Sequence, residues 1–411
     1  MVNVNEFFGK TDDEIINKAI AGRDKDGIVV IPPRQNKTEP ERDFWLIDNA
    51  ILLPSDTTVI LKNCKIKLSD RCRDNFFRSA NCGLNENDPE KITNIHIIGE
   101  GVSILEGADH PRSTGDSGKL LCVPCPHDEK DLLSFGSWIS DEEKACGKVA
   151  RGNFHNHSYG TDFDKEGENK SGDWRNIGIL FANVEYFSIK NVSIKDSHCW
   201  GISLEACRHG SIEKINFDSR LYKFIDGVKS NIENQDGIDL RNGCNDLIIS
   251  DITGQTGDDV IALTAIAAKN CVFSGGYSTH VMHSDWERRE RGIKNVIIKN
   301  VIAKSYWCWV IRLLPVESTI ENVIIDNVID TSEDEVGGGI LIGEADASYG
   351  RVLPDSAKNV AISNVIANKA QSVFVKGYLT NSTITNVINR YESGQIIRTV
   401  RENALNNVKI D

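Results

Sequence analysis

A short phrase of alternating apolar and polar residues recurs from about Leu46 to the C-terminus. Each copy is an Asn, two or three apolar residues alternating with polar ones, and then another Asn; copies begin at Asn183, Asn295, Asn322 and Asn359. The apolar residues are mostly β-branched, and the spacing typical of helices is absent over the same span. The phrase therefore predicts short β-strands.

The distance between copies of the phrase indicates how these strands are arranged. The copies at Asn295, Asn322 and Asn359 start 27 and 37 residues apart, and Asn381 follows 22 residues later. A minimum near 22 with a variable excess fits one coil of a solenoid with loops inserted at a corner. Asn tolerates left-handed backbone and forms side-chain ladders between coils. An antiparallel sandwich would need regular Asn-Gly or Asp-Gly hairpin turns, which are rare here. We expect one parallel β-helix domain over residues 1–411.

The N-terminal residues 1–45 carry a different pattern. Thr11 followed by Glu14 forms a capping-box pattern, and apolar residues at helical spacing follow at Ile15, Ile16, Ala19 and Ile20. A helix of about three turns is expected here, followed by a buried strand in residues 27–33 that ends at proline. The open end of a stacked sheet is an exposed edge, so this helix is expected to cover it.

Residues 108–173 interrupt the repeat. The stretch is polar and rich in Gly, Ser, Asp and Lys. A loop of this length in a compact protein is usually functional or disordered, and we expect a lobe that borders the binding cleft. Cys122 and Cys125 with His127 form a single C-x-x-C, which is more often structural than metal-binding. His155 and His157 could line the cleft, although exposure at the surface is expected more often for such a polar loop.

Composition narrows the classes of partner. The formal net charge is −13, which argues against a nucleic-acid partner and requires a local basic patch for any acidic polysaccharide. The 40% hydrophobic content supports a continuous core. No run is long and apolar enough for a membrane span. Eleven cysteines without a visible secretion signal suggest reduced thiols and a cytoplasmic location. The oligomeric state is not predicted.

Three aspartates stand at a spacing that matches the repeat. Asp236 lies in the segment Asn234–Leu240, and Asp258 and Asp259 lie in the segment Gly257–Leu263. Asp236 precedes Asp258 by 22 residues and Asp259 by 23, which equals the minimum coil length. The two segments are therefore expected to be neighbours in one parallel sheet.

Three crowded carboxyl groups suit the hydrolysis of a glycosidic bond. Crowding of like charges raises the pKa of at least one of them, which leaves a proton for a general acid. Glycoside hydrolysis needs one protonated carboxyl for the leaving oxygen and one carboxylate for water. Two other interpretations remain. Asp-Gly and Gly-Asp are common in ordinary turns, and clustered carboxylates can hold the calcium of a polysaccharide lyase.

These segments resemble the polygalacturonases, glycoside hydrolase family 28, within the wider superfamily of pectin-degrading β-helices. Residues 234–237 look like the family's Asn-Thr-Asp-Gly motif, and residues 257–259 look like its Gly-Asp-Asp motif. Residues 197–200 resemble its Ser-Pro-x-Trp coil, and residues 312–314 stand where the family has Arg-Ile-Lys. The resemblance covers roughly residues 5–400 and is strongest from 175 to 315.

The resemblance implies a right-handed parallel β-helix and an inverting hydrolase that uses no metal or cofactor. Asp258 would be the general acid, and Asp236 and Asp259 would hold and activate the water. Asn234 and Arg312 would contact the substrate, an oligo- or polysaccharide that contains uronic acid or a related sugar. The implied alternatives are a lyase or epimerase on the same fold, and a non-catalytic carbohydrate-binding β-helix.

The chain departs from the family pattern at three places. Gln235 replaces Thr, and the Gly-His-Gly motif is missing, so His280 or His283 is expected to take the role of its histidine. Leu314 replaces the Lys that, with Arg, grips the substrate carboxylate. The basic cluster of residues 286–291, with Arg288 and Arg289, is a candidate to restore that grip, although it also fits a solvated loop. Two aromatic residues are candidates to stack on a sugar, and core packing is expected for one of them: Trp307 and Trp309.

Overall fold

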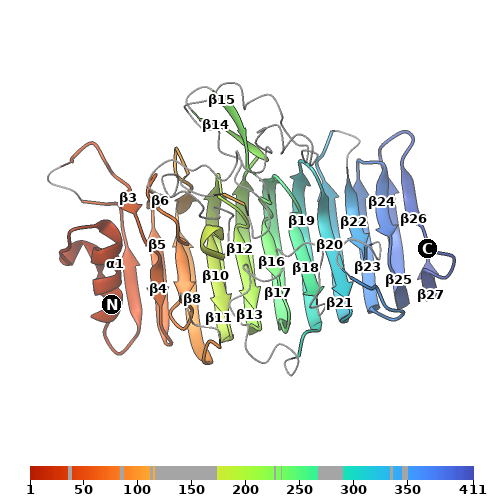
Figure 1. Ribbon diagram of the computed structural model, residues 1–411, viewed down its shortest axis with the longest axis horizontal. Helices are drawn as coiled ribbons and strands as arrows, with labels where there is room; N and C mark the ends of the chain where they lie inside the picture. Colours follow the sequence, from red (N-terminus) through yellow and green to blue (C-terminus); the bar gives the residue numbers. More distant parts are fainter. Residues whose placement is uncertain are drawn as a thin grey trace, which may run out of the picture.

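The structure is a computed structural model that describes residues 1–35, 39–83, 88–111, 114–115, 174–225, 228–232, 234–266, 290–333, 337–344 and 350–411. Its strands stack into an elongated solenoid with the two termini at opposite ends (Figure 1). Neighbouring strands of the two long sheets run parallel, and each sheet gains a strand from nearly every coil. The parallel β-helix predicted from the spacing of the repeat is confirmed.

The larger sheet contains 15 strands. Its main path, in spatial order, is β1 (Val2–Asn3), β2 (Ile28–Ile31), β5 (Thr57–Lys62), β8 (Ile92–Glu100), β11 (Val184–Lys195), β13 (Arg208–Asp218), β17 (Asn245–Thr256), β19 (Ile293–Ser305), β21 (Ile320–Asp330), β23 (Ala357–Ala367), β25 (Leu379–Asn389) and β27 (Leu405–Ile410). Short strands lie beside this path: β3 (Trp45–Ile47), β6 (Lys65–Leu68) and β9 (Ile104–Glu106).

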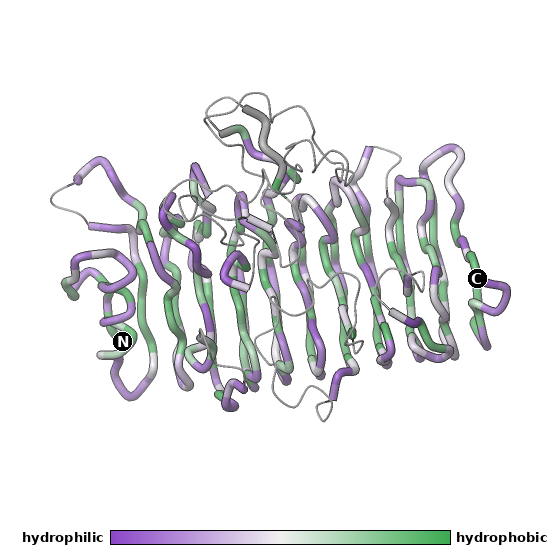
Figure 2. Tube along the Cα trace, viewed as in Figure 1, coloured by the Kyte–Doolittle hydropathy of each residue, from purple (hydrophilic) through white to green (hydrophobic). Residues whose placement is uncertain are grey.

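The smaller sheet contains 10 strands and carries the candidate site. In chain order they are β4 (Ile51–Leu53), β7 (Phe77–Ser79), β10 (Ile179–Ala182), β12 (Ile202–Glu205), β16 (Ile238–Leu240), β18 (Ile261–Ile266), β20 (Trp309–Val316), β22 (Gly338–Ile342), β24 (Gln371–Val375) and β26 (Gln395–Thr399). Apolar side chains from both sheets form one continuous core that runs the length of the solenoid. The hydropathy colours show the apolar residues following the strands and the polar ones gathering at the turns (Figure 2).

The recurring asparagines form side-chain ladders between coils, as the repeat predicted. Asn322 donates to Asn295 at 3.0 Å, and Asn359 donates to Asn322 at 3.0 Å. All three have left-handed backbone, with φ of 58°, 58° and 55° in chain order. The register between β19 and β21 skips Asn295. Asparagine is suited to this position because it adopts left-handed φ at low cost and its amide bonds to the next coil.

The predicted helix is present as α1 (Asp12–Ala21), and the strand expected after it is β2. The Thr11 side chain accepts the Glu14 N–H, while the Glu14 carboxylate accepts the Lys10 N–H at 2.7 Å. The helix lies at the N-terminal end of the solenoid with its apolar face in the core, next to η1 (Val4–Glu6) (Figure 1). The helix therefore lies at the open N-terminal end of the stacked sheets, where a strand edge would otherwise be exposed.

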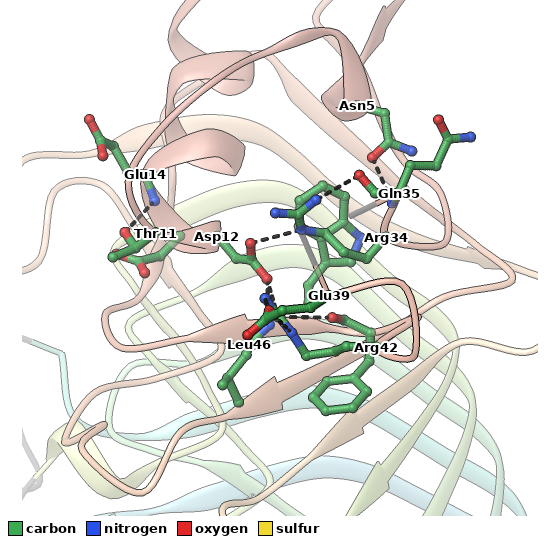
Figure 3. A network of polar contacts seen from close by, with 12 residues as sticks. Asn5, Thr11, Asp12, Glu14, Arg34, Gln35, Glu39, Arg42 and Leu46 are labelled. Carbon is green, nitrogen blue, oxygen red and sulfur yellow. Dashed lines mark hydrogen bonds and ion pairs between the residues drawn. The ribbon is translucent and has the colours of Figure 1, made fainter. Parts of the chain in front are cut away.

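A buried charge network ties this helix to the first coils (Figure 3). The Asp12 side chain is 5% exposed and accepts from Arg34 at 2.8 Å and from Arg42 at 2.6 Å. It also accepts the Leu46 backbone N–H at 2.9 Å. Because each oxygen of this buried carboxylate has a charged donor, its burial is compensated.

Within the described residues, a hairpin leaves the regular coil: β14 (Tyr222–Ile225) and β15 (Val228–Asn231) pair antiparallel, which was not predicted from the sequence. The lobe predicted for residues 108–173 lies almost entirely outside the described residues, together with the cysteines and histidines singled out in it, so it stays a prediction. The described chain resumes at η4 (Trp174–Asn176). No described helix has the length and apolar character needed to cross a membrane.

Candidate active site

The aspartates singled out in the sequence lie at the start of neighbouring strands in the smaller sheet. Ile238 of β16 pairs with Ile261 of β18, so Asp236 is in register with Asp259, each two residues earlier. The Gly237 N–H donates to the Asp259 carbonyl oxygen at 2.9 Å. Neighbouring strands lie about 4.8 Å apart. The structure therefore brings Asp236 and Asp259 together, one coil apart along the solenoid.

Glycines beside these aspartates allow the coils to approach closely. A Cβ on Gly237 would lie 2.4 Å from the Val260 carbonyl oxygen, and one on Gly257 would lie 2.6 Å from the Leu221 nitrogen. Real Cβ contacts are essentially never this short. Neither glycine has a left-handed backbone. Both glycines lie in the bends that join strands of the solenoid, so a role in ordinary turns and a role in placing the aspartates are compatible.

Asp259 is the most enclosed of the three aspartates. It is 1% exposed, and its carboxylate accepts the Trp309 N–H at 2.9 Å and the Arg312 guanidinium at 3.4 Å. Burial raises the pKa of Asp259 to about 7; Arg312 opposes this shift, and the nearby Asp258 adds to it. Crowding of the carboxyl groups predicted a raised pKa for at least one of them, and the raised pKa is that of Asp259. Burial contributes more to this shift than the neighbouring Asp258 does.

Asp258 has a different environment because its side chain is partly exposed. Its carboxylate accepts the Asp259 N–H at 3.0 Å, and its carbonyl oxygen accepts the Thr256 hydroxyl at 2.6 Å. The Cys308 thiol lies against it, and burial together with both aspartates raises the pKa of Cys308 well above its ordinary value. The sulfur therefore stays a neutral thiol that donates a hydrogen bond to Asp258.

Cys308 was not singled out from the sequence. The only available signal was its position immediately before Trp309, which is in register with Asp259. Among the described residues, Asp258, Asp259 and Cys308 offer atoms within 4.8 Å of one another that are able to ligate a metal. Calcium takes six to eight oxygen ligands, whereas only two of these three residues offer carboxylate oxygens and the third offers a sulfur. These residues therefore do not fit the calcium site of a lyase.

Arg312 begins a chain of alternating charges on the outer face of the smaller sheet. Its neighbours Ile311 and Leu313 both lie in the core, so Arg312 points away from it. Beyond Asp259, it donates to the Glu344 carboxylate at 3.0 Å, and Lys376 donates to the other oxygen of Glu344 at 2.9 Å. Each contact here joins a cation to an anion.

Glu344 and Lys376 were not identified from the sequence. The pairing of β20 with β22 and of β22 with β24 places Lys376 two coils above Leu314, with Gly343 between them. Leu314 itself is 2% exposed and packs with Ile266 and Val316. The resemblance leads one to expect a lysine at position 314, where this chain has leucine. Lys376 stands in the same column of the sheet, two coils further along the solenoid.

The two tryptophans that flank Arg312's strand have different surroundings. Trp309 is 8% exposed and packs against Leu341 and Phe374, with ring centroids of Trp309 and Phe374 5.9 Å apart. Trp307 is 60% exposed. Core packing was expected for one of the two; Trp309 is buried, but in a small cluster with Leu341 and Phe374 outside the continuous core. Trp307 keeps an exposed surface that suits contact with a sugar ring.

The segment before Asp236 is anchored to the previous coil. Asn234 adopts left-handed backbone with φ of 53°. The Gln235 amide, 1% exposed, donates to the Ser197 carbonyl oxygen at 2.7 Å. Burial lowers the pKa of His198 to about 3, so its ring is neutral and accepts the Ala108 N–H at 2.9 Å. The Gln235 bond to Ser197 and the Gly201 N–H, which donates to the Asp236 carbonyl oxygen at 2.8 Å, tie the segment of Asp236 to the previous coil.

Four of the residues singled out from the sequence lie outside the described residues: His280, His283, Arg288 and Arg289. Whether a histidine assists the acid, and whether the basic cluster borders the site, therefore stay predictions. The described part of the site comprises the three aspartates, Cys308 and the three charged side chains of Arg312, Glu344 and Lys376.

Known proteins were compared with this chain by sequence and by fold. No protein-family model and no curated protein matches it. An exopolygalacturonase from Thermotoga maritima matches with a TM-score of 0.55 and 17% identity, over 100% of this chain and 91% of that one. A family 28 exopolygalacturonase from Yersinia enterocolitica matches with a TM-score of 0.50 and 12% identity, over 100% and 77%. PfbA, a surface adhesin of Streptococcus pneumoniae, matches with a TM-score of 0.56 and 12% identity, over 100% and 86%.

At sequence identities of 12% to 17%, these matches show a shared fold and do not show a shared function. They include enzymes and an adhesin, so the fold alone does not separate catalysis from binding. Function has to be argued from the aspartates and their surroundings. The chain is a parallel β-helix similar in structure to the polygalacturonases that its motifs resemble.

Proposed function

We propose that this protein is an inverting glycoside hydrolase that cleaves an oligo- or polysaccharide containing uronic acid or a related sugar. The observation that carries the proposal is the register that sets Asp236 beside Asp259, with Asp258 adjacent in the chain. In this scheme Asp258 protonates the leaving oxygen. Asp236 and Asp259 hold and activate the attacking water on the other side of the bond.

Differences in exposure support this division of roles. Asp258 is partly exposed, so its carboxyl group is open to a glycosidic oxygen, whereas Asp236 is 8% and Asp259 1% exposed. The Arg312 guanidinium and the Trp309 N–H favour the charged form of Asp259. Burial raises the pKa of Asp259, whereas the proposed acid is Asp258, so the proposal requires the two neighbouring carboxyl groups to share one proton. We propose that in the active form this proton resides on Asp258 while Asp259 stays charged.

Replacement of Asp258 by Asn tests this proposal. The amide cannot donate a proton to the leaving oxygen, so kcat should fall by about 10²- to 10⁴-fold. Because Asp258 is only partly buried, the variant should fold normally. Reducing-sugar release on a panel of pectic, uronic and neutral oligosaccharides gives the rate, and NMR of the first product gives its anomeric configuration.

A matched control is available on the other sheet. Asp251 has a left-handed backbone that Asn also tolerates, and it accepts a bond from Asn300 at 2.9 Å. Asp251→Asn should retain wild-type turnover. Full activity in Asp258→Asn would show that another group is the acid, and retention of configuration would exclude the inverting mechanism.

Two other functions share the fold. A lyase or epimerase would depend on calcium and, for the lyase, give an unsaturated product that absorbs in the ultraviolet. A carbohydrate-binding β-helix, in keeping with the fold shared with the adhesin PfbA, would bind sugars without turnover on any of them. Product analysis with and without a calcium chelator separates all three, since the proposed hydrolase is indifferent to the chelator.

A further inference from the structure

Glu344 lies between Arg312 and Lys376 and pairs with both. Without Glu344, these two cations would face a ligand at the proposed reacting centre. One carboxylate oxygen accepts from Arg312 at 3.0 Å and the other from Lys376 at 2.9 Å. The three side chains are 11%, 13% and 30% exposed for Glu344, Arg312 and Lys376. Arg312 also reaches Asp259. A carboxylate held by an arginine and a lysine, one contact away from a reacting aspartate, is the arrangement expected of a bound acidic sugar.

The geometry of the coils explains how Lys376 reaches this position. Leu314, Gly343 and Lys376 follow one another in one column of the smaller sheet. Gly343 has left-handed backbone with φ of 76°, and a Cβ there would lie 2.5 Å from the Gly377 Cα. The position between Leu314 and Lys376 thus carries no side chain. The lysine is free to turn towards Glu344 and Arg312.

The segment that carries Glu344 is held in place. Arg401 donates to the Lys376 carbonyl oxygen at 2.9 Å and to the Glu344 carbonyl oxygen at 3.4 Å. This bridge fixes the two chain segments relative to each other. Glu344 is therefore positioned by its backbone as well as by its carboxylate.

We propose that Glu344 permanently fills a carboxylate-binding position, so that the sugar ring bound at the reacting centre carries no carboxylate and belongs to the neutral sugars. This rests on the proposed hydrolase function and names its substrate class. Arg312 and Lys376 are already paired with carboxylates of the chain itself, Arg312 with Asp259 and Glu344, and Lys376 with Glu344. A uronate ring would add a further negative charge at short range, where repulsion is strong.

The first test measures anion binding without any turnover. Glu344→Ala removes the internal carboxylate and leaves Arg312 and Lys376 facing an opening. Sodium galacturonate should therefore raise the Tm of Glu344→Ala by binding to the folded state, while galactose at matched ionic strength should not. The wild type should show no such rise. Glu344→Gln also removes the charge but keeps the side chain in place, so it should not respond to galacturonate.

A control variant lies on the other sheet. Glu321 pairs with Lys358 at 2.9 Å with side chains 28% and 35% exposed, so Glu321→Ala opens an ion pair of similar length far from the column. It should not respond to galacturonate. The proposal is overturned if Glu344→Ala does not respond, or if the wild type itself binds galacturonate in the same concentration range.

The second test uses turnover. For each linkage that the wild type hydrolyses, kcat/KM is measured on the uronic oligosaccharide and on its carboxyl-reduced neutral counterpart. The neutral form should be preferred, and Glu344→Ala should shift the ratio towards the uronic form by about tenfold or more. A wild-type preference for the uronic form refutes the inference but leaves the hydrolase proposal intact. Absence of turnover on every substrate refutes the hydrolase proposal, and the anion-binding test still decides the role of Glu344.

Discussion

Asp259 should make the folded protein less stable as the pH rises, and replacing it by Asn should remove this dependence. The carboxyl group is 1% exposed, and its pKa is raised from 3.8 to about 7. The folded chain therefore binds a proton at Asp259 more tightly than the unfolded chain does. Stability from this group is fully present below pH 3.8, declines between 3.8 and about 7, and is lost above 7.

The size of the effect follows from the two pKa values. Each pKa unit corresponds to 1.36 kcal/mol, so ionising Asp259 in the fold costs at most about 4 kcal/mol relative to ionising it in the unfolded chain. An amide carries no such cost. Its oxygen still accepts the Trp309 N–H, and Arg312 keeps Glu344 as a partner. The Asn amide nitrogen facing Arg312 reduces the gain, so we expect a stabilisation of a few kcal/mol at pH 8.

The assay is urea unfolding followed by tryptophan fluorescence, at several values between pH 4 and pH 8. The quantity of interest is the free energy of unfolding of Asp259→Asn minus that of the wild type. This difference cancels the pH dependence of groups that do not interact with Asp259; the neighbouring Asp258 is coupled to it and does not cancel. It should increase as the pH rises, in favour of the variant, and most of the increase should occur below about pH 7.

Two results would refute this reasoning. If the difference between the variant and the wild type does not change with pH, the pKa of Asp259 is not raised by burial. If the variant becomes relatively less stable as the pH rises, the Arg312–Asp259 contact outweighs burial and the pKa is lowered. Loss of activity in the variant is expected in either case, so activity is not the readout.

Two further predictions concern the pH profile and the asparagine ladder. If the Asp258–Asp259 pair must hold one proton, kcat should fall as the pH rises through about 7; a rise in kcat through pH 7 would show that the pair must lose this proton for activity, so that Asp258 is not the acid. Asn322→Ala should lower the free energy of unfolding by about 2 kcal/mol, because Ala disfavours left-handed φ and the two ladder bonds are lost. Asn322→Gly loses only the bonds and should be less damaging in the same urea titration; equal stability of both variants would contradict the backbone argument.

Much of the fold followed from local features of the sequence. Alternation of apolar and polar residues defines a strand, and an asparagine that favours left-handed φ defines where it bends, as at Asn322 and Asn359. The N-terminal helix was predictable because its capping residues lie within one turn of each other. The neighbouring positions of Asp236 and Asp259 were also predictable. The segment between them is one coil without an insertion, so their separation in sequence equals one step of the solenoid.

The surroundings of the aspartates were decided only by the tertiary structure. Glu344 lies 32 residues from both Arg312 and Lys376. This separation is longer than the minimum coil length of 22 residues, because the coils here contain insertions. Spacing in the sequence therefore does not reveal that these side chains lie together. The raised pKa of Asp259 depends on burial, which arises from several coils at once. The sequence by itself therefore determined the solenoid and the alignment of Asp236 with Asp259, because both follow from the local pattern and the length of a single coil. The tertiary structure decided the burial that raises the pKa of Asp259 and the contacts of Glu344 with Arg312 and Lys376, because those depend on side chains that separate coils bring together.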